Sequence, residues 1–128
     1  SRVLHISLWV IQILLALAFG MAGFMKVSMP IADLAAKGMG FVNHTQEGMV
    51  RFIGTVEILG ALGLILPSAF RIKPILTPIA ALGISTIMLL SIKEHLSQNE
   101  PIIVNIVLLL MAVFIAWGRF KKVSIQPK

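Results

Sequence analysis

The chain has no cysteine among its 128 residues. This excludes disulfide bonds, thiolate nucleophiles and Cys-ligated iron–sulfur clusters within the chain. A redox role would therefore require a bound cofactor or a partner subunit. Cysteine usage gives no information about the compartment.

Charged residues are also scarce. Only 12% of the chain is charged and 58% is hydrophobic, whereas a soluble domain usually has about 25% charged and 45–50% apolar residues. So few polar residues cannot cover the surface of a globular protein of this size in water, which excludes a water-soluble domain. The apolar residues form four blocks, at about 6–25, 52–66, 75–92 and 102–118, each close to the roughly 20 residues that cross a bilayer as a helix. We therefore predict an all-α membrane protein with a four-transmembrane-helix bundle.

The expected organisation is a single integral membrane domain over residues 1–128. The spans should cover about 6–27, 48–67, 74–95 and 101–118, with Pro67 closing the second. Residues 30–37 should form a short helix on the outer surface between spans 1 and 2. The first apolar block is longer than the 7–15 residues of a signal-peptide core, which favours a span over a cleaved signal.

Acidic residues are missing from one end of this bundle. Four spans place the N-terminus, the 67–74 loop and the C-terminus on one side, which has seven bases: Arg2, Arg71, Lys73, Arg119, Lys121, Lys122 and Lys128. Short loops rich in Lys and Arg stay in the cytoplasm, so both termini should be cytoplasmic. Topology and anionic lipid then explain the net charge of +6, without a nucleic-acid partner.

The few polar residues within the spans share helix faces with small residues. At about 100° per residue, each span has one stripe that combines the two kinds, as in Gly54, Glu57, Gly60 and Ala61 of span 2. Small and hydrogen-bonding residues mark faces where membrane helices meet. All four stripes should therefore face the interior. The resulting pocket candidates are Lys26, Glu57, Ser91, His95 and Asn105.

Glu57 is the most informative of these residues. It lies about nine residues below the outer end of span 2, or roughly 13 Å at 1.5 Å per residue, where an unpaired carboxylate is costly. Arg51 lies about 120° around the same helix, so Lys26 at the end of span 1 is the better partner. The pair is either a structural ion pair or part of a pocket that binds a ligand or handles protons.

His95 has two interpretations as well: a quinone ligand or proton carrier, or a histidine at a helix end. Glu94 and His95 diverge on a helix, and His44 joins them only if the first outer loop folds over the bundle. We therefore predict no metal site.

Three short motifs indicate a family. FGMAGFMKV (19–27), VEILGALGLIL (56–66) and a third span that ends in KEH (93–95) resemble the DoxX-like family of four-span bacterial membrane proteins, over about residues 7–118. The resemblance implies Lys26, Glu57 and His95 as the family's polar positions. It also implies a bacterial cytoplasmic membrane location and a link to quinone-coupled redox enzymes.

Two functions remain open from the sequence. The first is a redox-linked subunit that binds quinone, or another lipophilic small molecule, in an outward-opening pocket. The second is a non-enzymatic accessory or assembly subunit of a larger membrane complex. Both functions imply that the chain contacts the lipid bilayer. Both also imply that it binds either a membrane protein partner or further copies of itself. The incomplete chemistry predicts that the chain is not a complete enzyme alone, and no residue is assigned a catalytic role.

Overall fold

Each apolar block forms one helix in the computed structural model, which describes residues 1–128. The long helices are α1 (Arg2–Ser28), α3 (Glu47–Phe70), α4 (Leu76–Ser97) and α5 (Ile103–Trp117). A π-helical turn, η2 (Gly118–Lys122), extends α5. With that extension, four helices are long and apolar enough to cross a membrane. The predicted all-α, four-span bundle is confirmed.

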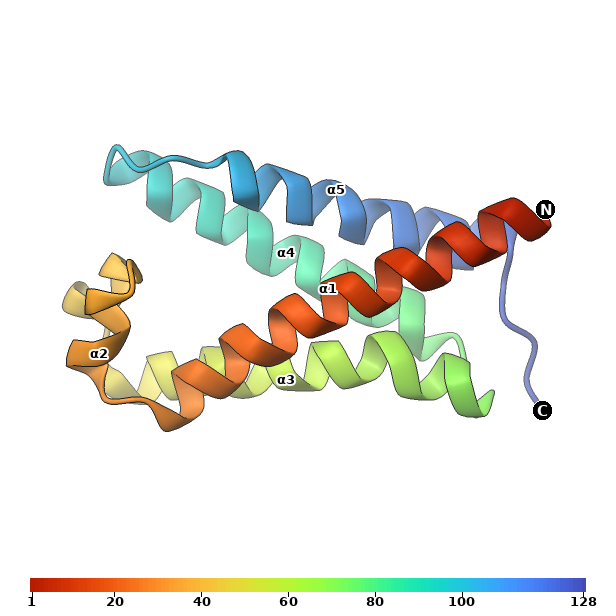
Figure 1. Ribbon diagram of the computed structural model, residues 1–128, viewed down its shortest axis with the longest axis horizontal. Helices are drawn as coiled ribbons and strands as arrows, with labels where there is room; N and C mark the ends of the chain where they lie inside the picture. The colour runs from red at the N-terminus through yellow and green to blue at the C-terminus, as the bar shows by residue number, and fades with distance from the viewer.

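The bundle consists of two antiparallel helix pairs. α1 packs most extensively against α3, and α4 against α5. Figure 1 shows these pairs close together at the end that holds both termini, and separating toward the other end. We call the first the base-rich end, because residues 1–2, 71–75 and 118–128 lie there. We call the second the cavity end, formed by residues 26–47 and 91–105.

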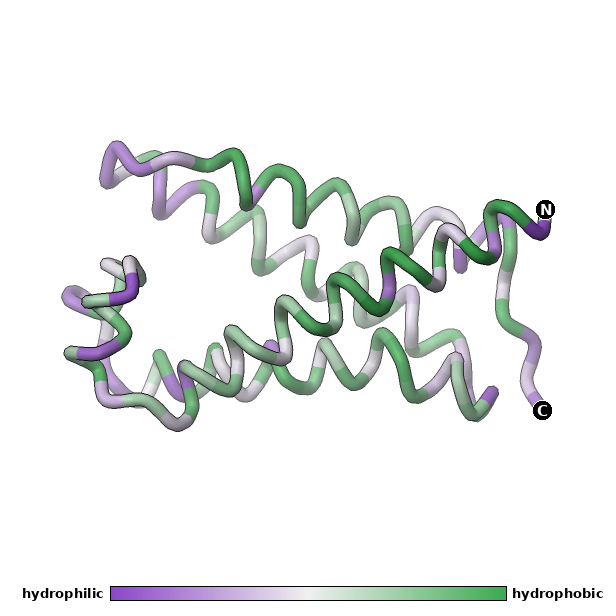
Figure 2. The backbone as a smooth tube through the Cα atoms, viewed as in Figure 1, coloured by the Kyte–Doolittle hydropathy of each residue, from purple (hydrophilic) through white to green (hydrophobic).

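Hydropathy follows the same division along the bundle axis. Figure 2 shows apolar residues along the full length of the long helices, with hydrophilic residues concentrated toward the two ends. Large apolar side chains cover the outside, including Leu17, Phe24, Leu59 and Leu110, each at least 60% exposed. The interior contains Leu15, Leu64, Ile84 and Ile115 among other apolar residues. An apolar exterior of this kind fits contact with lipid.

The first connection folds into two short helices, as its length allows. α2 (Ile31–Ala36) and the 3₁₀-helix η1 (Gly40–His44) lie between α1 and α3. Leu34 of α2, Val42 of η1 and Val50 of α3 form a small buried cluster of their own. This cluster fixes the connection against the start of α3 at the cavity end.

The prediction that Pro67 closes the second span is wrong, because α3 continues through Pro67 to Phe70. Proline has no N–H to donate to the carbonyl four residues earlier, here Gly63. That carbonyl instead accepts a hydrogen bond of 3.0 Å from the Thr77 hydroxyl on α4. Ser68 in turn donates to the Thr77 oxygen at 2.6 Å. The neighbouring helix α4 therefore supplies the hydrogen-bond donor that proline lacks.

Other helix boundaries differ from the expected ones by a few residues. α1 begins at Arg2 rather than near residue 6, and α5 begins at Ile103 rather than at Pro101. α4 begins at Leu76 because residues 71–75 form a tight link, in which Arg71 and Lys73 have φ values of 56° and 46°. These shifts leave the order and pairing of the spans unchanged.

Thr77→Val should destabilise the bundle, because it leaves the Gly63 carbonyl without a partner in the apolar interior. We expect a loss of about 1–3 kcal/mol in the free energy of unfolding, the usual cost of an unsatisfied buried group. Thr86→Val is the matched control, since the Thr86 hydroxyl is exposed and bonds only within its own helix. Unfolding in mild detergent, followed by circular dichroism, measures both. Equal stability of the two variants would show that Thr77 does not support the proline.

Candidate functional site

The site begins where the backbones of α1 and α3 approach each other most closely. A Cβ atom on Gly23 would lie 2.6 Å from the carbonyl oxygen of Gly54, and one on Gly54 would lie 2.7 Å from the Cβ of Lys26. Neither position has room for a side chain. The two glycines therefore bring Lys26 directly over α3, one turn from Glu57.

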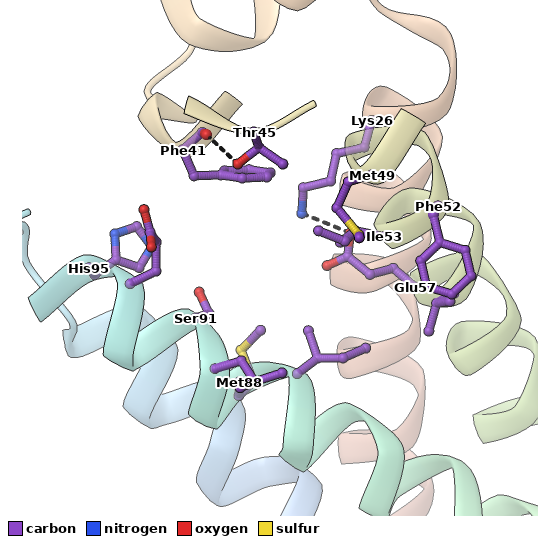
Figure 3. Close-up of a pocket in the computed structure, with 14 residues that line it drawn as sticks. Lys26, Phe41, Thr45, Met49, Phe52, Ile53, Glu57, Met88, Ser91 and His95 are labelled. Carbon is purple, nitrogen blue, oxygen red and sulfur yellow. Dashed lines mark hydrogen bonds and ion pairs between the residues drawn. The ribbon is translucent and has the colours of Figure 1, made fainter. Parts of the chain in front are cut away.

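Lys26 and Glu57 form the expected ion pair. The distance from Lys26 Nζ to Glu57 Oε1 is 2.7 Å, and the side chains are only 12% and 3% exposed. The ammonium also lies 5.6 Å from the centre of the Phe41 ring, within range of a cation–π contact. Figure 3 shows Lys26 and Phe41 on one side of the carboxylate and α4 on the other. The pair is enclosed by apolar groups, so neither charge is strongly screened by water.

Arg51 is not a partner of Glu57, as its position on the helix indicated. Its Nη1 donates to the carbonyls of Lys26 and Met29, at 2.8 and 2.6 Å. Its Nη2 lies 3.3 Å from Glu47 one turn away. Arg51 therefore holds the end of α1 against α3 and leaves Glu57 to Lys26.

A cavity of about 490 Å³ lies beside the ion pair, between α3 and α4. Its lining is mostly apolar and includes Ile53 and Val56 of α3 and Ile87 and Met88 of α4. Phe52 and Leu90 also line it, yet they are 61% and 64% exposed on the outside of the bundle. The cavity therefore reaches the flank of the bundle between these two helices.

A second lobe of about 240 Å³ lies on the opposite side, between α1 and α5. Ala18, Phe19 and Ala22 of α1 line it, together with Asn105 and Leu108 of α5. The two lobes share Lys26, Phe41, Glu57, Met88, Ser91 and His95. The polar groups are thus placed where the lobes meet, with apolar surface on either side.

The remaining predicted residues lie in the same place. His95 lines both lobes, and its Nδ1 lies 2.8 Å from Glu100 Oε1. Asn105 Nδ2 donates to Ser91 Oγ at 2.8 Å, joining α5 to α4. The structure therefore brings together all five candidates: Lys26, Glu57, Ser91, His95 and Asn105.

The first connection does fold over the bundle. His44 of η1 pairs with Glu94 of α4 through its Nε2 atom, and Phe41 and Thr45 line the first lobe. No group of three or more His, Asp or Glu side chains is placed to hold a metal ion. Phe41 could not be predicted from the sequence, because its position depends on how this connection folds.

A second polar cluster lies at the base-rich end and was not predicted. Arg119 is buried there, with His5 and Gln12 of α1 as hydrogen-bond partners. Arg119 was counted among the bases of the predicted cytoplasmic side, and its burial was not expected. The π-helical turn that carries it inward has no simple sequence signature.

Removing one member of the Lys26–Glu57 pair should lower the free energy of unfolding far more than removing both. Glu57→Gln leaves a buried ammonium without a counter-charge, and Lys26→Met does the same to the carboxylate. Loss of one partner of a buried pair costs about 3–5 kcal/mol. The double variant should recover much of that loss, and unfolding in mild detergent measures all three. Independent, additive losses would contradict direct pairing.

Comparison with known proteins agrees with this architecture. The model of the DoxX-like family matches residues 10–116, which include α3 and α4 complete and nearly all of α5. No curated protein sequence and no solved structure matches the chain. Because the match extends over most of the 128 residues and over every candidate of the cavity, the chain is a member of the DoxX-like family.

Proposed function

We propose that the cavity binds a small lipophilic molecule with a polar head, and that this ligand is a quinone of the membrane. The chain would act as a redox-linked subunit of a larger membrane complex. The observation that carries the proposal is the placement of a buried acid–base pair at the junction of two apolar lobes. Binding sites of this kind combine an apolar lining with a few convergent polar groups.

The polar groups at the junction match the oxygens of such a ligand. Lys26 can donate to a carbonyl oxygen with the protons that Glu57 does not use. The His95 ring is held through Nδ1 by Glu100, which leaves Nε2 for a ligand. A quinone has polar oxygens on an apolar ring. Its oxygens can therefore bind these polar groups while its ring and tail pack against the apolar side chains of the lobes.

The position of the openings supports entry from the bilayer. Phe52 and Leu90 belong both to the cavity lining and to the outside of the bundle. At the cavity end, η1 and its His44–Glu94 pair lie over the first lobe. A ligand dissolved in the membrane therefore has a shorter path than one dissolved in water.

A subunit role follows from what a quinone reaction requires. Oxidation or reduction of a quinone moves electrons, and this chain has no cysteine to carry them. A bound cofactor or a partner protein must then supply or accept them, and we propose the partner protein. An accessory or assembly role without a ligand is the competing function, and the following experiment separates the two.

Val56→Phe should block the first lobe and weaken quinone binding. The added ring occupies cavity volume beside Glu57, and we expect affinity to fall about tenfold or more, equivalent to about 1.4 kcal/mol. Leu59→Phe is the matched control, because Leu59 is on the same helix and 62% exposed to the outside. Equilibrium dialysis of a short-chain naphthoquinone against protein in nanodiscs measures binding.

Two results would overturn the quinone proposal. The first is no binding by the parent protein at any accessible concentration, and stoichiometric co-purification of a partner would then favour the accessory role. The second is equal loss in Val56→Phe and Leu59→Phe, which would place the ligand outside the cavity.

We further propose that the base-rich end faces the cytoplasm of a bacterial inner membrane. That end has seven bases and no acid, whereas all five carboxylates belong to the rest of the chain. Bases in short loops are retained in the cytoplasm.

Single cysteines at the two ends provide the test of orientation, because the chain has no thiol of its own. Lys37→Cys should react with a membrane-impermeant maleimide in cells whose outer membrane is permeabilised, and Lys121→Cys should not. Both lysines are exposed, so lysed cells should label both. The reverse pattern would show the opposite orientation.

A further inference from the structure

Arg119 occupies an unusual position at the base-rich end. It lies in the π-helical turn η2, two residues after Trp117, and its side chain is turned into the bundle with only 2% exposed. The neighbouring bases Lys121 and Lys122 remain exposed. π-helical turns are rare, and those inside α-helices frequently occur at functional sites.

Every hydrogen bond that Arg119 makes goes to a neutral acceptor. Nε donates to Gln12 Oε1 at 2.7 Å, and Nη1 donates to His5 Nδ1 at 3.0 Å and to the Val123 carbonyl at 2.9 Å. Gln12 is itself fixed, because its Nε2 donates to the Leu64 carbonyl at 2.7 Å. The third nitrogen, Nη2, is the one buried side-chain polar atom in the chain without a partner.

No carboxylate is available to neutralise this guanidinium. Four of the five acids pair elsewhere, in Lys26–Glu57, His44–Glu94, Arg51–Glu47 and His95–Glu100. The fifth, Asp33, is on α2 at the cavity end. A buried cation without a counter-charge is strongly unfavourable. The unused Nη2 donor and the uncompensated positive charge together favour an anionic partner for Arg119.

The position of Arg119 relative to the bilayer indicates which anion is available to it. The guanidinium lies 5.8 Å from the Trp9 ring, and Lys122 lies 5.9 Å from the Trp117 ring. Tryptophans of membrane proteins collect at the level of the lipid headgroups. The bundle thus places Arg119 near the layer of lipid phosphates, among bases that attract anionic lipid.

We propose that Arg119 binds the phosphate of an anionic phospholipid, with Nη2 as the donor that the chain leaves unused. His5 and Gln12 orient the guanidinium by occupying its other nitrogens. Protein encloses Nη2, so the phosphate reaches it only when the covering residues move. Displacement of Val123, whose carbonyl accepts from Nη1, would free a second donor for the phosphate. Arginine suits this role because its fork of donors can bind phosphate through two bonds. This inference is independent of the proposed quinone site.

Native mass spectrometry of the delipidated full chain tests the proposal. The probes are phosphatidylglycerol, phosphatidylcholine and inorganic phosphate, each added separately. We expect the parent protein to prefer phosphatidylglycerol over phosphatidylcholine by about tenfold, and Arg119→Gln to lose that preference. Lys121→Gln removes the same charge from an exposed neighbour and should keep most of the preference.

Several outcomes would overturn this assignment. An equal preference in Arg119→Gln and the parent would show that the exposed bases attract the lipid. Stable binding of inorganic phosphate, lost in Arg119→Gln, would indicate a site for free anions instead. If Arg119→Gln does not fold, Arg119→Lys keeps the charge without the fork and should bind the lipid more weakly than the parent. Equal binding by Arg119→Lys, or no lipid preference in the parent protein, would also contradict the proposal.

Discussion

The close approach of α1 and α3 at Gly23 and Gly54 is the constraint on which the site depends. Cβ atoms at these positions would lie 2.6 Å from a backbone oxygen and 2.7 Å from the Cβ of Lys26. Because the backbones meet here, the Lys26 side chain is close enough to contact Glu57 directly. The distance from Nζ to Oε1 is 2.7 Å. A larger residue at either position would separate the charges and leave both in an apolar interior.

The cavity follows from how the other helix pair is placed against this contact. α4 and α5 separate from α1 and α3 toward the cavity end (Figure 1). The hydrogen bond from Asn105 to Ser91 holds α5 against α4 there. η1 comes over from the opposite side and pairs with α4 through His44 and Glu94. The enclosed space thus has charged and hydrogen-bonding groups at its centre and apolar lobes on two flanks.

Much of this arrangement could be predicted from the sequence, because lipid leaves few choices for polar residues. The spans follow from hydrophobic length, and the depth of Glu57 together with the position of Lys26 indicates their pairing. Pro67 was misjudged because its effect depends on Thr77, which lies on another helix. The burial of Arg119 depends on a π-helical turn that hydropathy does not detect. The pairing of His44 with Glu94 depends on a small cluster around Leu34 and Val42 that fixes the first connection.

The buried Lys26–Glu57 ion pair organises the cavity. Solid-state NMR of the protein in lipid bilayers measures this directly, through the dipolar coupling between the lysine ¹⁵Nζ and the glutamate ¹³Cδ. We expect a strong coupling assigned to Lys26 and Glu57, consistent with an Nζ–Oε1 contact of 2.7 Å, that disappears in Glu57→Gln. The absence of that coupling in the folded parent protein would show that the two side chains are not paired in the membrane.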